Sequence, residues 1–131
     1  GLEGVRYPCI LVLLFLAVTF VQSAYDKIFG WQGNIDWLKG HFANTSLLKN
    51  NVPLSLGIIL FLELITGVLT LVGCVELLIN GGRTFGFYGA VFSCITLILL
   101  LLGQRLAKDY DGARTIAIYF VPAVLAVFWL S

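Results

Sequence analysis

The chain has 131 residues, of which 60% are hydrophobic and 11% are charged, and its formal net charge is +1. Soluble domains carry about 25% charged residues, and each helix of a soluble bundle needs a polar face. Residues 10–16 and 97–102 are apolar on every side and show no period-two alternation, which excludes a soluble bundle and a membrane β-barrel.

Charged residues are absent from three long stretches and nearly absent from a fourth. Residues 7–25, 85–103 and 115–131 contain none, and residues 50–75 contain only Glu63. A helix of roughly 20 apolar residues, rising about 1.5 Å per residue, crosses the bilayer core of about 30 Å. The sequence therefore predicts an all-α, integral membrane four-helix bundle with spans at about residues 7–25, 53–78, 85–103 and 114–130.

The first span begins like a secretory signal, because Arg6 precedes the apolar core and residues 21–24 end in small side chains. We interpret it as a retained spanning helix. The chain contains no Met, so we expect the translated start to lie outside it.

The connection after the first span, roughly residues 26–51, carries an amphipathic segment. One apolar stripe recurs there at steps of four, three and four residues, formed by Trp31, Ile35, Leu38 and Phe42. With Trp37 nearby, this pattern favours a helix in the membrane interface, its aromatic face among the lipid headgroups. A substrate lid or a partner-docking surface is the alternative interpretation.

Glu63 is the sharpest feature of the spans, because a carboxylate inside a membrane is costly and marks function by default. Small and hydroxyl-bearing residues continue its helix face and recur on the third span, namely Thr66, Gly67 and Thr70, then Gly86, Gly89 and Ser93. Such residues let helices approach closely and hydrogen-bond across the contact. We expect the second and third spans to meet through these faces, with Glu63 turned inward.

Two roles are open for Glu63. In a structural role, its protonated carboxyl is satisfied by a neighbouring hydroxyl, or by Arg105 or Lys27 reaching into the membrane. In a functional role, it handles protons or contacts a quinone.

The connection between the third and fourth spans is rich in charge. Arg105 and Lys108 suit the C-terminal end of a helix, and Asp111 can cap the N–H groups of the next one. The alternating charges of Arg105, Lys108 and Asp109 also favour a polar contact that orients a partner protein. The second expected contact surface consists of Trp31, Trp37 and Phe42.

The sequence assigns no catalytic residue and no metal site. The single histidine, His41, lies outside every predicted span, so we expect no haem inside the bundle. Clusters of His, Cys or carboxylates at ligand spacing are absent. Cys9, Cys74 and Cys94 form no Cys-x-x-Cys pair, and we interpret them as small structural residues. A quinone is the one cofactor that the sequence leaves as an alternative.

Several short motifs resemble the DoxX family of small four-span bacterial membrane proteins. The matching positions are Arg6, Phe20, Ala24 and Lys27 in the first span, and Glu63, Gly67, Leu69 and Gly73 in the second. Residues 103–113 are similar to the third connection of the family, whereas Tyr25 stands where members often have Gly. The resemblance covers nearly the whole chain, so residues 1–131 are interpreted as one DoxX-like transmembrane domain.

The resemblance implies a bundle that works beside a redox partner, because the name-giving members are subunits of a thiosulfate:quinone oxidoreductase. We therefore expect an accessory subunit of the bacterial inner membrane that supports a redox or quinone-linked complex and is not catalytic alone. Its expected partners are the lipid bilayer and other membrane or envelope subunits, not nucleic acid. The alternatives are a structural subunit of an envelope assembly without a redox role and a small transporter, which the scarcity of polar residues in the spans disfavours.

Overall fold

The computed structural model describes residues 4, 6–41 and 51–131, and this part of the chain forms five helices and no strand. The helices are α1 (Arg6–Phe29), α2 (Trp31–His41), α4 (Val52–Ile79), α5 (Thr84–Leu106) and α6 (Tyr110–Leu130). By length and composition, α1, α4, α5 and α6 can each cross a membrane. The predicted all-α fold with four spanning helices is confirmed, and the chain is an integral membrane protein.

Every spanning helix is longer than the sequence predicts, and the extension of α1 matters most. α1 continues to Phe29 instead of ending at Tyr25, so Lys27 lies in its last turn. A helix continues through such a charge when the long side chain finds a polar partner. For Lys27 this partner is Glu63 of α4.

The start of α6 is set by a cap other than the expected one. Asp109 accepts a hydrogen bond from the N–H of Gly112 at 3.0 Å, and the helix begins at Tyr110. The side chain therefore satisfies one of the free N–H groups of the first turn. Asp111 lies inside that turn and pairs with Arg114 instead, so the expectation that Asp111 is the cap is wrong.

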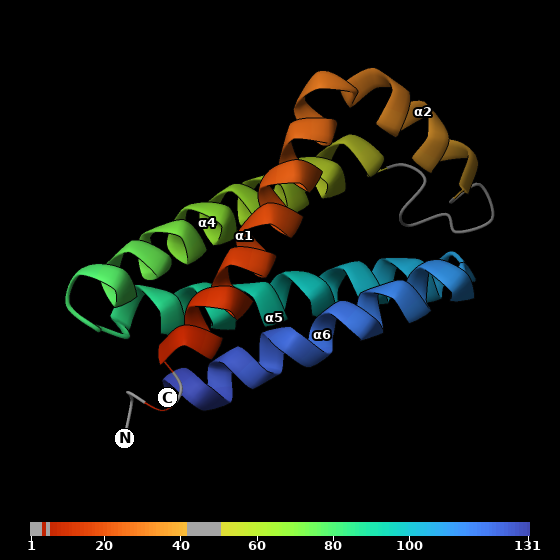
Figure 1. The fold of residues 1–131 in the computed structure, drawn as a ribbon. Helices are drawn as coiled ribbons and strands as arrows, with labels where there is room; N and C mark the ends of the chain where they lie inside the picture. The colour runs from red at the N-terminus through yellow and green to blue at the C-terminus, as the bar shows by residue number, and fades with distance from the viewer. Residues whose placement is uncertain (1–3, 5, 42–50) are drawn as a thin grey trace.

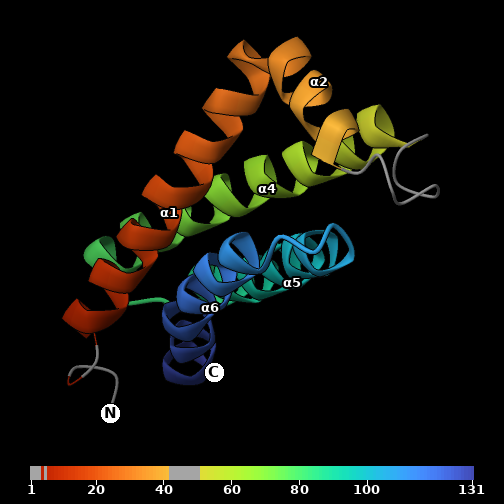
Figure 2. The ribbon, with the colours of Figure 1, turned by 90° about the vertical axis from the view of Figure 1, so that its right-hand side faces the viewer.

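The spanning helices run up and down, and the start of α1 and the end of α6 lie at the same end of the bundle (Figure 1). The most extensive contacts join α1 with α4, α4 with α5, and α5 with α6. Figure 2 shows α4 above α5 and α6, with α1 rising from the level of α6 to the top of the molecule. α1 also touches α6, and the shared core includes Leu13, Leu16, Phe20, Ala123 and Ala126.

The side chains are distributed as in a membrane protein. The fully buried polar ones are Glu63, Thr66, Thr70, Ser93 and Thr96. Large apolar side chains point outward along every spanning helix, including Leu11, Phe61, Ile98 and Phe128. Water would disfavour this arrangement, because soluble proteins bury apolar residues and expose polar ones, whereas lipid tails favour it.

α4 and α5 approach most closely where glycines face each other. A Cβ added to Gly73 would lie 2.5 Å from the Cα of Gly86, and one added to Gly89 would lie 2.9 Å from Thr70 Cγ2. Ser93 is buried on the same side of α5. The structure thus brings the second and third spans together through Gly86, Gly89 and Ser93, as small residues at a membrane helix contact allow.

α1 packs antiparallel along α4. Arg6 Nε and Nη2 donate to the carbonyl oxygens of Leu77 and Leu78 at 2.8 and 3.1 Å. The Leu77 carbonyl also accepts the N–H of Gly81, so Arg6 adds a second bond there and one at Leu78, in the last turn of α4 where helix carbonyls lack partners within the helix. Gly67 belongs to this contact, since a Cβ added there would lie 2.9 Å from Val21 Cγ2. The expectation that Gly67 packs against the third span is therefore wrong.

α2 folds back against the first turns of α4 (Figures 1 and 2). Ile35 is buried against Val52 and Leu56, and Trp31 and Leu38 pack beside it. The last turn of α1 reaches only the middle of α4, at Glu63. α2 therefore covers apolar residues in the first turns of α4 that α1 does not contact. The predicted stripe therefore packs against α4 at these residues, and its placement in the membrane interface stays a prediction.

Candidate functional site

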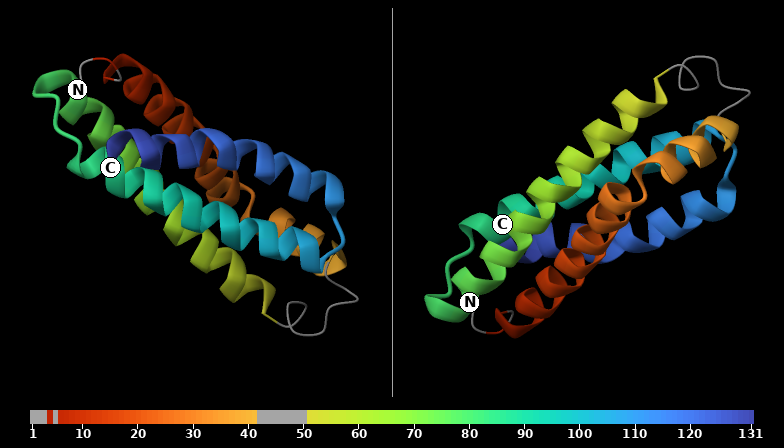
Figure 3. Two further views of the ribbon diagram at one scale, coloured as in Figure 1. Left: turned by 90° about the horizontal axis from the view of Figure 1, so that it is seen from below. Right: turned by 90° about the horizontal axis from the view of Figure 1, so that it is seen from above.

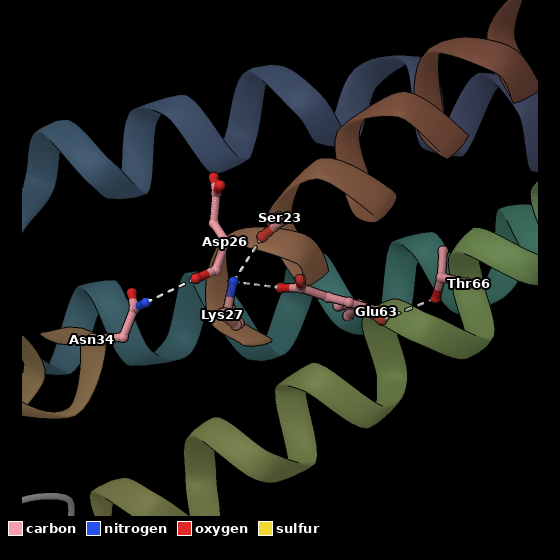
Figure 4. Close-up of polar contacts among 7 residues, drawn as sticks. Ser23, Asp26, Lys27, Asn34, Glu63 and Thr66 are labelled. Carbon is pink, nitrogen blue, oxygen red and sulfur yellow. Dashed lines mark hydrogen bonds and ion pairs between the residues drawn. The ribbon is translucent and has the colours of Figure 1, made fainter. Parts of the chain in front are cut away.

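Glu63 lies near the middle of α4, and its side chain is fully buried. Lys27 Nζ is 2.9 Å from Glu63 Oε1 and donates to Ser23 Oγ at 2.7 Å (Figure 4). Ser23 and Lys27 are one turn apart on α1, so both side chains face α4. The candidate site is therefore an ion pair that joins α1 to α4, with a hydroxyl beside it.

Of the partners considered for Glu63, the structure places Lys27 beside it. Arg105 lies elsewhere, with its guanidinium carbon 5.2 Å from the centre of the Tyr110 ring. The Lys27 side chain is 16% exposed, so its long stem crosses the contact while its head reaches the carboxylate. Removal of two charges from water offsets much of their attraction, and the best-attested use of such a pair is to fix the register of two elements.

The hydroxyl groups near Glu63 are used within and between the helices. Thr70 Oγ1 donates to the carbonyl oxygens of Thr66 and Gly67, at 2.8 and 3.0 Å. The hydroxyl oxygens of Thr66 and Thr96 are 3.4 Å apart across the contact between α4 and α5. The carboxylate of Glu63 is instead met by the ammonium group of Lys27, at 2.9 Å. Thr66 and Thr70 therefore serve helix packing. The polar residues that accompany Glu63 in the candidate site are Lys27 and Ser23.

A cavity of about 410 Å³ lies at the end of the bundle where α2, the start of α4 and the end of α5 meet. Lys27 lines it, so the ion pair borders the cavity. The other polar side chains of the lining are Asn34, Ser55 and Gln104. The apolar lining comes from three helices and includes Leu38, Val52, Leu56, Ile59, Leu99 and Leu100.

Asn34 fixes the corner between α1 and α2. Its Nδ2 donates to the carbonyl oxygen of Asp26 at 3.3 Å (Figure 4) and to that of Gly30 at 2.8 Å. These bonds hold α2 against the end of α1, which is how Lys27 and the α2 residues come to line one cavity. Sequence reasoning missed Ser23, Asn34 and the cavity, although the four-residue step from Ser23 to Lys27 was a usable signal.

The expected partner-contact residues do not gather into one surface. Arg105 stacks on Tyr110 and Asp109 caps α6, so both have a structural use within the chain. Lys108 adopts a left-handed backbone with φ of 60° at the end of α5. Trp37 lines the cavity and is 58% exposed. Phe42 lies outside the described residues.

The described residues contain no group of three or more His, Cys, Asp or Glu side chains that could hold a metal ion. Cys9, Cys74 and Cys94 are unpaired, and Cys74 Sγ donates to the Ile10 carbonyl at 3.6 Å. Comparison of the chain with models of protein families, with curated proteins and with solved structures found no match.

Proposed function

We propose that the chain is a DoxX-like accessory subunit of the bacterial inner membrane that supports a redox or quinone-linked partner complex. The observation that carries this proposal is the Lys27–Glu63 ion pair beside a largely apolar cavity that Lys27 lines. Ionisable groups inside a membrane bundle are rare and usually functional. A polar centre beside room for an apolar molecule offers a place where a partner enzyme and a lipid-soluble electron carrier can meet.

In this proposal the chain binds and orients, and the partner supplies the electron chemistry. Flavins, haems and iron–sulfur clusters carry such chemistry themselves, and proteins supply the surroundings. Different parts of this chain have different roles in this proposal. The four spanning helices form the scaffold, and the ion pair fixes α1 on α4. The last turn of α5 with Arg105, and the connection after it with Lys108, provide the contact with the partner.

A purely structural subunit of an envelope assembly is the second candidate. One observation favours it, since Lys27 and Glu63 satisfy each other and would hold the register of α1 on α4 without any ligand. The two candidates differ in what they predict for the partner, because only an accessory subunit of a redox complex requires a partner with a redox cofactor.

The test is affinity purification of the chain in mild detergent, followed by partner identification and an absorption spectrum. The proposal predicts a membrane-associated partner with a flavin, haem or iron–sulfur spectrum. Replacement of both Arg105 and Lys108 by Gln should release that partner and leave the bundle folded, because these charges orient the contact. Arg114→Gln is the matched control, since Arg114 already pairs with Asp111. Recovery of only colourless envelope proteins would favour the structural candidate.

A further inference from the structure

We propose that the cavity between α2, α4 and α5 binds one apolar molecule whose polar end is an uncharged carbonyl group. The proposal names the class of molecule that the subunit takes up, and in that sense it rests on the proposed function. It is nevertheless tested on the isolated chain, so the outcome does not depend on finding a redox partner.

The cavity follows from how α4 and α5 pack. Their backbones are drawn together at one end by the contact of Gly73 with Gly86. Toward the other end, large aliphatic side chains such as Ile59 and Leu99 stand between them, and the two helices diverge (Figure 3). α2 covers part of the resulting space. A volume of about 410 Å³ lies within the range of about 300–1,000 Å³ that is usual for ligand pockets.

The wall of the cavity suits a flexible apolar body. Most of its side chains are aliphatic, with Trp37 added from α2. Several of them, including Ile58 and Leu102, are also half exposed on the outer apolar surface, so the cavity opens where lipid tails surround the protein. An apolar molecule dissolved in the membrane can therefore enter without crossing a polar barrier.

The polar end offers hydrogen-bond donors without net charge. The Lys27 ammonium has three N–H donors, of which one meets Glu63 Oε1 and one meets Ser23 Oγ. Within the described part of the chain the third remains for a ligand, because Lys27 itself lines the cavity. The side-chain amide of Gln104 lines it too and can donate a second hydrogen bond. A carbonyl oxygen is the uncharged acceptor that these donors suit.

Charged head groups fit this end poorly. An anionic head would compete with Glu63 for Lys27, and the fully buried carboxylate would then lose its counter-ion, which is strongly unfavourable. A cationic head would be repelled by Lys27. Because the pair is neutral as a whole, the ligand that costs least is an uncharged one that accepts hydrogen bonds.

The experiment compares matched probes on the purified chain in nanodiscs of one defined lipid, with binding measured by native mass spectrometry. The probes share an eleven-carbon chain and differ in the head: undecane, 2-undecanone, undecanoate and undecylammonium. We expect the ketone to bind about tenfold more tightly than the other three, which corresponds to about 1.4 kcal/mol for the added hydrogen bonding. A short-chain benzoquinone and a monoacylglycerol, used as two further arms, distinguish a quinone from a neutral lipid as the natural source of the carbonyl.

Two variants locate the site. Ser55→Phe places a ring in the cavity and should abolish binding of every probe, whereas Leu71→Phe, on the outer face of α4, should not. The double variant Lys27→Met with Glu63→Leu should still bind the apolar chain but should lose the preference for the ketone. If Ser55→Phe does not fold, the head-group series on the unaltered chain decides the question.

Three results would overturn the proposal. Equal binding of all four heads to the unaltered chain would mean that the cavity accepts only lipid tails. Preference for undecanoate would make Lys27 an anion receptor. Unchanged binding to a folded Ser55→Phe variant would place the site elsewhere in the protein.

Discussion

The ion pair between α1 and α4 makes the strongest stability prediction. At the observed 2.9 Å and an effective dielectric constant of about 20, the attraction between the two charges is about 6 kcal/mol. Lys27→Met leaves a fully buried carboxylate unpaired and should cost about 4 kcal/mol of unfolding free energy. Glu63→Leu leaves a lysine that is 16% exposed and should cost less, about 2 kcal/mol, because part of the charge can be solvated. The double variant should lie within about 1 kcal/mol of the unaltered chain.

The assay is denaturant unfolding in mixed micelles, followed by a fluorogenic thiol reagent. Cys9 and Cys74 are 0% and 7% exposed, so their reaction reports loss of the packed bundle. The matched control is the same cycle on Asp111 and Arg114, which are also 2.9 Å apart but 90% and 73% exposed and should show coupling below about 0.5 kcal/mol. Additive losses at Lys27 and Glu63 would refute the buried pair.

Three further substitutions, with Gly33→Ala as a control, test the packing and the helix ends, and their unfolding is followed by the same assay. Gly73→Ala should cost about 1–3 kcal/mol of unfolding free energy, because its Cβ would lie 2.5 Å from the Cα of Gly86. Gly33→Ala has open space around it and should stabilise α2 slightly. Equal effects of the two substitutions would contradict the close contact between α4 and α5. Arg6→Gln should cost about 1–3 kcal/mol through the lost bonds to two carbonyl oxygens of α4, and a neutral result would show that water replaces them. Asp109→Ala should cost about 1 kcal/mol at the start of α6, and a circular dichroism spectrum without loss of helix signal or stability would argue against the cap.

The spanning helices could be predicted because bilayer thickness imposes one simple rule on the sequence. An uncharged stretch of the right length is enough, and the four predicted spans lie within the observed helices. The inward position of Glu63 followed from the cost of a charge in lipid. These are local properties of the chain, visible without knowledge of which helices touch.

The contacts between helices were harder to predict, because they depend on register. Gly67 and Thr70 are three residues apart on α4, yet Gly67 packs on α1 and Thr70 on α5. The stripe containing Ile35 has the pattern of an interfacial helix, but α1 ends early enough for that stripe to cover α4. Neither outcome can be read from periodicity, since a period identifies an apolar face and not its partner.

The most direct test of the proposed function is quinone reduction by the purified complex and by its separated parts in the same lipid. With a thiol or thiosulfate as electron donor, the chain alone should show no turnover above background. The partner alone should reduce quinone slowly, and the chain added back should restore the rate of the complex. Robust turnover by the chain alone, or a full rate from the partner without it, would contradict the role of accessory subunit.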